Sequence, residues 1–257
     1  MNKTFNFYYY LFILVIILFL FEGLYHHYYY KISEIYNFLT FRSQSGHNPF
    51  VWDEKGIVEN FQIILLFISI IFFLSFLKKI KFNSKKSQII LLFYLFALCY
   101  YFLEEISWGQ HLFGWKTPEF FSSINQQNET NFHNTSNLLN ELPRHLLTLW
   151  CCSFMILYVV EKRFNVNENL RYFTIPNKNL KKISTLILIF FIPDFVVDKF
   201  NLYPGHPTTD IADIRINMFL DIVTFNFIRL SELHELLFNY YILAHSYYLN
   251  KFDLNVK

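Results

Sequence analysis

Long apolar runs separated by polar segments constrain the fold of this chain more than any other feature of its sequence. Five of them are nearly free of charged residues, and they cover residues 5–21, 61–77, 89–103, 146–160 and 183–197. A helix needs roughly 20 apolar residues to cross a bilayer, or somewhat fewer where interfacial side chains flank it. The runs therefore predict membrane-spanning helices with Tyr, Trp and Lys side chains as interface anchors.

The composition agrees with a membrane protein and argues against several other classes. Of the 257 residues, 54% are hydrophobic and only 16% are charged. The formal net charge of +2 gives no electrostatic case for nucleic acid as a partner. All three cysteines, Cys99, Cys151 and Cys152, lie inside apolar runs, so we expect neither a disulfide framework nor a cysteine metal site.

We therefore predict an all-α fold, a polytopic membrane helix bundle that forms one integral membrane domain with a large outer-face cap. The six expected spans cover residues 5–24, 59–77, 87–105, 144–161, 182–198 and 230–249. The cap would consist of the outer segments 25–58 and 106–143. Residues 211–229 would form an interfacial helix, and the alternative is one long helix over 211–249. No small-residue cleavage pattern follows the first run, which we interpret as a retained span.

The distribution of Lys and Arg predicts the orientation of the bundle, because cytoplasmic loops carry an excess of these residues. The loop after the second span and the loop after the fourth are rich in them, whereas the segments 25–58 and 106–143 hold few. With six spans, both termini are then cytoplasmic. We expect the protein in the inner (plasma) membrane of a bacterium, with the lipid bilayer as its principal partner.

Ionisable side chains collect at the outer ends of the predicted spans. Such groups are costly in or beside a membrane and usually face a cavity or a partner. The candidate catalytic residues are Glu104 and Glu105 at the end of the third span, and His111, Glu129 and His133 in the outer segment that follows it. The candidate metal ligands are Glu104, Glu105, Glu232 and Glu235.

Clustered carboxylates and imidazoles at a low-dielectric site allow two kinds of chemistry. They can bind a divalent metal ion, or one desolvated carboxyl can act as a general acid or base. The structural alternative is that these carboxylates pair with Arg144, Arg215 and Arg229 and only hold the bundle together.

Two polar motifs resemble those of a known group of proteins. The sequence EEISWGQHLFGW at residues 104–115, together with ETNFHN at residues 129–134, resembles a family of uncharacterised bacterial multispan membrane proteins, and DEKGIVENFQ at residues 53–62 is similar to a further element of that family. The resemblance implies a multispan membrane protein and carries no activity with it. The family pattern has Arg at the position of His111. If that Arg binds an anion in the family, the role does not carry over to this chain.

A second similarity is to alkaline ceramidases and related seven-span hydrolases. It rests on Trp52-Asp53-Glu54 and on Asn134-Thr135-Ser136-Asn137. The paired histidine zinc ligands of those enzymes have no counterpart, because His234 and His245 are eleven residues apart. Zinc amidase activity is therefore not assigned.

Three functions remain open on the sequence. The first is a metal-assisted, membrane-embedded hydrolase or transferase that acts on a lipid or lipid-linked substrate at the outer face. The second is a transporter or binding subunit with a carboxylate-lined path. The third is an interaction scaffold whose cap binds a partner and is held in place by the polar cluster.

Overall fold

The structure is all-helical wherever the chain is described. This computed structural model describes residues 6–29, 51, 56–80, 85–125, 128–161, 180–200 and 230–251, and every regular element in these ranges is a helix. The predicted all-α class is therefore confirmed for this part of the chain.

Each predicted span coincides with a long helix. The helices are α1 (Phe7–Tyr29), α4 (Ile57–Lys79), α5 (Lys85–Glu105), α8 (Asn137–Glu161), α10 (Lys181–Phe200) and α12 (Leu230–Lys251). Within the described residues, two helices are long and apolar enough to cross a membrane, namely α4 and the part of α5 from Gln88 to Glu105. The structure thus supports membrane association and establishes two candidate spans.

Two helix boundaries differ from the prediction by more than two residues. Helix α1 continues to Tyr29 instead of ending near residue 24. Helix α8 begins at Asn137, seven residues before the predicted start at 144, and it contains Pro143. Its start is fixed by Ser136, whose backbone is extended and whose hydroxyl accepts a 3.3 Å hydrogen bond from the amide of Leu139. The predicted interfacial helix 211–229 and most of the segment 25–58 lie outside the described residues.

The chain divides into two compact units. One consists of Met1–Asn60 and Leu186–Leu237, and the other of Phe61–Thr185 and Phe238–Lys257. In the first unit, the ring of Phe191 lies 5.8 Å from that of His234. The polar motifs at 104–115 and 129–134 belong entirely to the second unit, which is described in more detail.

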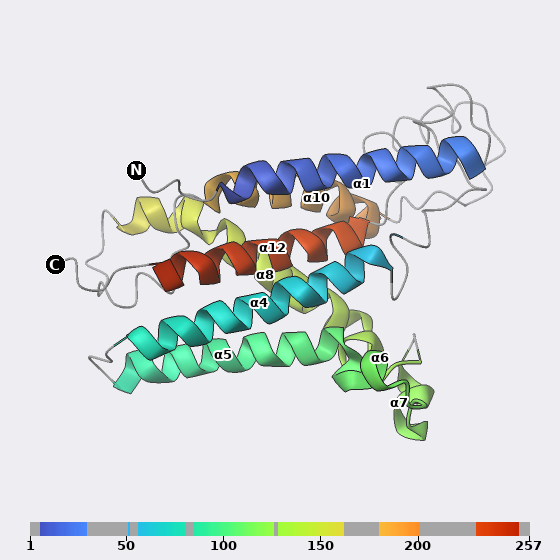
Figure 1. Cartoon of the computed structure of the whole chain (residues 1–257), viewed down its shortest axis with the longest axis horizontal. Helices are drawn as coiled ribbons and strands as arrows, with labels where there is room; N and C mark the ends of the chain where they lie inside the picture. The colour runs from blue at the N-terminus through green and yellow to red at the C-terminus, as the bar shows by residue number, and fades with distance from the viewer. Residues whose placement is uncertain are drawn as a thin grey trace. The chain divides into compact units, whose positions relative to one another are not determined.

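Helices α4 and α5 form an antiparallel pair in the second unit (Figure 1). Phe73 meets Tyr94 at 4.7 Å between ring centroids, and Phe67 meets Phe102 at 6.0 Å, so the two helices run in opposite directions. Charges at the ends of α4 suit its dipole, since Glu59 lies in the first turn and Lys78 and Lys79 in the last. The pair ends where α5 reaches the first polar motif.

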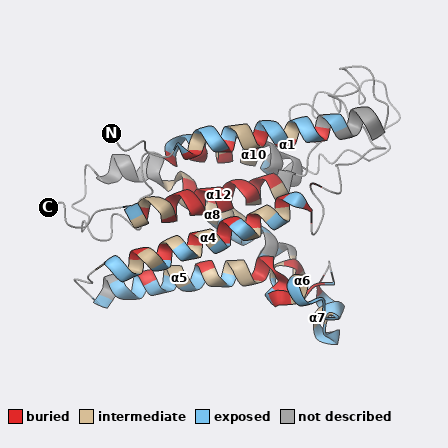
Figure 2. Ribbon diagram, in the orientation of Figure 1, coloured by how far each residue is buried: buried red, intermediate tan, exposed pale blue. Residues whose placement is uncertain are grey.

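Helix α12 is buried along most of its described length (Figure 2). Its C-terminal half packs against α4, where Phe72 lies 5.6 Å from Tyr247 and the Lys79 ammonium donates a 2.7 Å hydrogen bond to the Asn250 side chain. Trp150 of α8 contacts it as well, with its ring 5.1 Å from that of His245. Helices α4, α5 and α12 share a buried apolar core, against which Trp150 of α8 packs; it consists of Leu66, Phe73, Phe76, Leu91, Leu98, Ile242 and Leu249.

Candidate functional site

Helix α5 ends in an abrupt turn that begins the candidate site. Ser107, Trp108 and Gly109 follow one another with φ values of 46°, 55° and 102°. A left-handed conformation at a residue other than glycine costs on the order of 1–3 kcal/mol and persists only where surrounding contacts enforce it. The turn leads through the short helix η1 (Ser107–Gly109) into α6 (Gln110–Phe113). We call residues 104–134, as far as they are described, the corner.

The side chain of Glu104 ties the end of α5 to the second motif. One carboxylate oxygen accepts a 2.7 Å hydrogen bond from the indole N–H of Trp108. The other accepts hydrogen bonds from the backbone amides of Phe132 and His133, at 2.8 and 2.9 Å. The Nδ1 atom of His133 lies 3.3 Å from the same oxygen. The buried carboxylate of Glu104 therefore contacts residues that lie 28 and 29 positions further along the chain.

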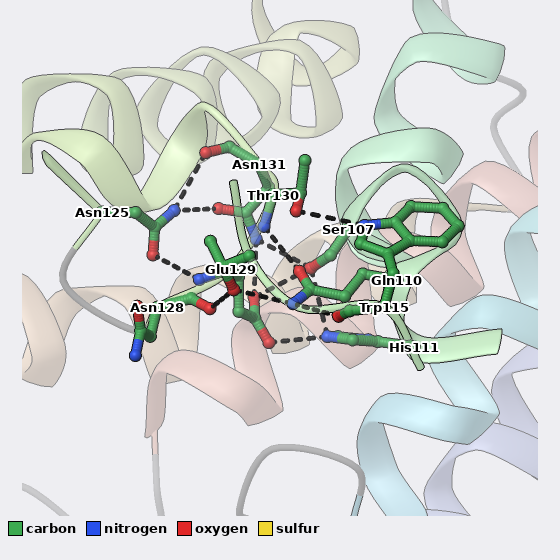
Figure 3. Close-up of polar contacts among 10 residues, drawn as sticks. Ser107, Gln110, His111, Trp115, Asn125, Asn128, Glu129, Thr130 and Asn131 are labelled. Atoms are coloured by element: carbon green, nitrogen blue, oxygen red, sulfur yellow. Dashed lines mark hydrogen bonds and ion pairs between the residues drawn. The ribbon is translucent and has the colours of Figure 1, made fainter. Parts of the chain in front are cut away.

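A second buried carboxylate, that of Glu129, makes the reciprocal connection to the first motif (Figure 3). The Ser107 hydroxyl and the Asn131 amide group donate hydrogen bonds of 2.9 and 2.7 Å to its Oε2 atom. His111 Nε2 lies 2.6 Å from its Oε1 atom. Asn131 also donates a 3.1 Å hydrogen bond to the Ser107 oxygen, which closes a small ring of polar contacts.

Side-chain amides complete the interior of the corner. Asn125 follows α7 (Glu119–Ile124), and its amide nitrogen donates to the backbone and side-chain oxygens of Asn131, at 2.9 and 2.7 Å. Its side-chain oxygen accepts a 3.1 Å hydrogen bond from the backbone amide of Glu129. The segment that carries Glu129 is thus held from both sides.

Gln110 makes a similar bridge on the other side of the turn. It donates a 2.8 Å hydrogen bond to the Thr117 hydroxyl and accepts a 2.7 Å hydrogen bond from the backbone amide of Thr130. The Thr117 hydroxyl in turn donates to the backbone oxygen of Asn128. The side chains of the two motifs therefore fold the intervening segment back onto the end of α5.

The electrostatics of Glu129 favour its ionised form. Burial raises the pKa of the Glu129 carboxyl, but the hydrogen bond and the charge of His111, followed by the hydrogen bonds from Ser107 and Asn131, outweigh burial and hold that pKa below its ordinary value. A general base that works near neutral pH needs a pKa close to 7. The shift of Glu129 goes in the opposite direction.

Ser107, His111 and Glu129 have the composition of a hydrolytic triad but not its connectivity. In a triad, one imidazole nitrogen contacts the nucleophile and the other contacts the carboxylate. Here His111 Nε2 lies 3.1 Å from the Ser107 oxygen and 2.6 Å from Glu129, so both groups meet the same nitrogen. Ser107 is also fully buried, and its hydroxyl donates to Glu129. These contacts of Nε2 stabilise the turn, and they differ from the contacts that an imidazole makes in a triad.

The corner brings together four of the five predicted catalytic residues, as two pairs. Glu104 meets His133, and His111 meets Glu129. Glu105 is buried next to Glu104 on the last turn of α5. Its predicted catalytic role remains a prediction.

The metal site predicted at Glu104, Glu105, Glu232 and Glu235 also remains a prediction. Glu232 and Glu235 are half-buried in the first turns of α12 and belong to the first unit. Among the described residues, no group of three or more His, Cys, Asp or Glu side chains is arranged to hold a metal ion.

The sequence analysis missed the uncharged members of the network. Ser107, Gln110, Asn125 and Asn131 are as central to the hydrogen bonding as the charged residues, and Ser107 and Asn131 are fully buried. Their position inside or beside the two motifs could have identified them, because polar side chains are unusually frequent in that stretch of the sequence.

No protein family, curated protein or solved structure matches this chain. The resemblance to uncharacterised bacterial multispan proteins therefore remains an expectation from the motifs.

Proposed function

We propose that this chain is a six-span protein of the bacterial inner membrane, with both termini in the cytoplasm, and that its corner is a rigid interaction scaffold at the outer face. The observation that carries the proposal is that two buried carboxylates of the corner, those of Glu104 and Glu129, are occupied by donors from the corner itself. Glu104 accepts hydrogen bonds from Trp108, Phe132 and His133, and Glu129 accepts them from Ser107, His111 and Asn131.

The exposed faces of the long helices support the membrane part of the proposal. On α5, Ile89, Phe93, Phe96 and Tyr100 are all exposed and recur every three or four residues, so they form one stripe. Soluble monomers rarely expose contiguous apolar surface of this kind. Helix α4 has a comparable stripe, formed by Ile57, Ile64, Phe67, Ile71 and Leu74. The remaining four spans are supported by long helices at the expected positions.

The state of the carboxylates favours a scaffold over a reaction centre. A carboxylate that acts on a substrate needs free lone pairs, or a pKa raised toward neutrality. The Glu129 carboxylate has three side-chain donors, and its pKa is held below the ordinary value. Such a group is suited to fixing backbone in a strained turn.

A membrane-embedded hydrolase or transferase that acts on a lipid or lipid-linked substrate is the second candidate. The contact between His133 and Glu104 favours it, because the imidazole side chain is 33% exposed while the carboxylate is only 4% exposed. A buried carboxylate that orients a partly exposed imidazole is a common arrangement for a general base. A divalent metal at Glu104, Glu105, Glu232 and Glu235 belongs to the same candidate.

A comparison of two substitutions separates these functions. Glu129→Gln removes an acceptor from the buried network, whereas His133→Ala removes an exposed imidazole and leaves its backbone hydrogen bond to Glu104 in place. For a scaffold, we expect the melting temperature of the purified protein in detergent to fall in Glu129→Gln and to change little in His133→Ala. The metal content of the purified wild-type protein should be substoichiometric.

The enzyme candidate predicts a different pattern in cells. His133→Ala would keep the wild-type melting temperature but abolish a change in cellular lipid composition that expression of the wild-type protein causes. That result, or one equivalent of tightly bound divalent metal that is lost in Glu105→Gln, would overturn the scaffold proposal. Identical lipid profiles for wild type and His133→Ala would support it.

A further inference from the structure

The outer surface of the corner carries several large apolar side chains, although its interior is polar. Phe113 is 77% exposed, Leu112 66% and Phe120 65%. Trp108, Trp115, Ile124 and Phe132 are exposed as well. Beneath them, Ser107 and Asn131 are fully buried. A segment that folds in water normally has the opposite distribution, with apolar groups inside and polar groups solvated.

Both tryptophans of the corner direct their polar atom inward. The indole N–H of Trp108 donates a 2.7 Å hydrogen bond to Glu104. The indole N–H of Trp115 donates a 3.4 Å hydrogen bond to the Thr130 hydroxyl. Both side chains are nevertheless 40% exposed. The polar requirement of each indole is thus satisfied within the protein, while part of each ring system remains on the surface.

The exposed aromatic side chains are packed against one another. Phe113 stacks on Trp115, with 5.8 Å between the ring centroids and 9° between the ring planes. On the other side, the half-buried ring of Phe121 meets Phe132 at 5.2 Å. The apolar side chains therefore contact one another at the surface of the corner.

The apolar surface of the corner continues the exposed stripe of α5. Tyr100, the last residue of that stripe, contacts Trp108 edge to face at 6.1 Å. Helices α6 and α7 follow at this end of α5, and α7 lies off the line of the α5 axis (Figure 1). Charged side chains are exposed beside the apolar ones, at Lys116 and Glu119. Apolar and charged residues side by side, just beyond the end of a span, are typical of the layer between lipid tails and water.

We infer that the corner is embedded in the interfacial layer of the lipid bilayer, with Leu112, Phe113 and Phe120 in contact with lipid. The inference rests on the proposed function and names the partner of its scaffold. In a medium with little water, polar groups have to be satisfied within the protein, and the hydrogen bonds of Glu104, Glu129 and Asn131 do so. If the corner were surrounded by water instead, its exposed apolar side chains would have no lipid to contact.

Site-directed spin labelling in vesicles tests this inference. Cys99, Cys151 and Cys152 are replaced by serine or alanine, and single cysteines are introduced at Phe113, Phe120, Phe93 and Lys116. The proteins are reconstituted in vesicles of phosphatidylcholine and phosphatidylglycerol. Accessibility of each nitroxide to oxygen, which enters lipid, is compared with accessibility to a water-soluble nickel complex. Phe93 of the α5 stripe is the lipid-facing control, and Lys116 is the control inside the corner.

For an embedded corner, labels at Phe113 and Phe120 are several-fold more accessible to oxygen than to nickel, and the label at Lys116 shows the reverse. Preferential nickel accessibility at Phe113 and Phe120, with Phe93 in lipid, overturns the inference and leaves the six-span proposal intact. Nickel accessibility at Phe93 overturns the proposed function itself. Spin–spin broadening at Phe113 and Phe120 that depends on protein concentration overturns the inference in favour of contact with a second copy.

A second measurement avoids the cysteine substitutions. Lipids that carry bromine near the headgroup quench tryptophan emission at interfacial depth. We expect the brominated lipid to quench more emission in the wild-type protein than in Trp115→Phe. The difference is the emission of Trp115. Equal quenching of the wild-type protein and of Trp115→Phe would contradict the embedded position.

Discussion

At the scale of single residues, Glu129 connects three other side chains of the corner. Its carboxylate accepts hydrogen bonds from Ser107, His111 and Asn131. Glu129→Gln replaces one carboxylate oxygen with an NH2 group, which cannot accept a hydrogen bond from these partners. Because hydrogen bonds to charged groups contribute about 1.5–3 kcal/mol each, we expect the free energy of unfolding to fall by about that amount. Thermal unfolding in detergent, followed by tryptophan fluorescence, measures the change.

Glu119→Gln is the matched control for this prediction. Glu119 is exposed in the first turn of α7, so its neutralisation should shift the melting temperature by little. Equal shifts in the two variants would show that the network around Glu129 does not stabilise the corner.

Protonation of the Glu129 carboxylate at low pH should destabilise the corner. The pKa of Glu129 is lower in the folded protein than its ordinary value of about 4.3, so ionisation of the carboxyl favours folding. This stabilisation is complete above the unfolded pKa and is lost as the pH falls through the folded pKa. We expect wild-type stability to decrease below about pH 4.3, and Glu129→Gln to show a smaller decrease. Parallel curves of stability against pH for the two proteins would contradict this assignment.

Gly109 is the residue on which the turn after α5 depends most directly. Its φ is 102°, and a Cβ atom there would lie 3.0 Å from Cη2 of Trp115. Gly109→Ala therefore combines backbone strain with a close contact, and we expect it to lower the free energy of unfolding by about 1–3 kcal/mol. Gly114→Ala is the control, since its φ of 69° causes strain but nothing lies within 4 Å of the added carbon. A larger loss in Gly114→Ala, measured by thermal unfolding, would contradict the role of the Trp115 contact.

At the scale of helices, the exposed stripe of α5 leads to a prediction about membrane insertion. Phe96 and Ile89 are equally exposed, at 66% and 65%, but Phe96 lies near the middle of α5 and Ile89 near its N-terminal end. A charged residue at the centre of a span costs about 2.5–3.5 kcal/mol, whereas one near the end reaches the interface. We expect Phe96→Lys to reduce the membrane-inserted fraction strongly and Ile89→Lys to reduce it little.

Extraction of membranes at alkaline pH, followed by quantification of the protein that remains in the pellet, measures the inserted fraction. Equal retention of Phe96→Lys and Ile89→Lys would indicate that the α5 stripe does not face lipid.

Helix positions were predictable from the sequence because apolar runs are long and uninterrupted, but helix ends were not. The start of α8 depends on Ser136, a capping residue that lies in an amide-rich stretch without an apolar period to mark the helix start. In the same way, Glu104 and Glu129 were identified as candidates from their charge. Their partners could not be identified, because the pairing of residues 28 positions apart depends on the left-handed turn at Ser107 and Trp108.

At the scale of the whole molecule, the loop charges predict which ends of the helices face the cytoplasm. Five lysines cluster at the junction of α4 and α5, in the last turn of α4, the loop and the first turn of α5: Lys78, Lys79, Lys81, Lys85 and Lys86. The segment between α5 and α8 has Lys116 as its single Lys or Arg. Because such clusters are retained on the cytoplasmic side, the α4–α5 loop should lie inside and the corner outside. Both termini then lie inside if all six long helices cross the membrane.

Labelling of single cysteines in intact cells tests this orientation. Lys78 and Lys116 are both exposed, so each cysteine should react whenever the reagent reaches it. In a variant without native cysteines, we expect a membrane-impermeant maleimide to label Lys116→Cys at once and Lys78→Cys only after the cells are permeabilised. A fluorescent protein fused after Lys257 should fluoresce, since such proteins mature in the cytoplasm. Labelling of Lys78→Cys before permeabilisation would show that the orientation is the reverse of the prediction. A dark fusion with correct cysteine labelling would place the C-terminus outside and indicate an even number of spans after the corner.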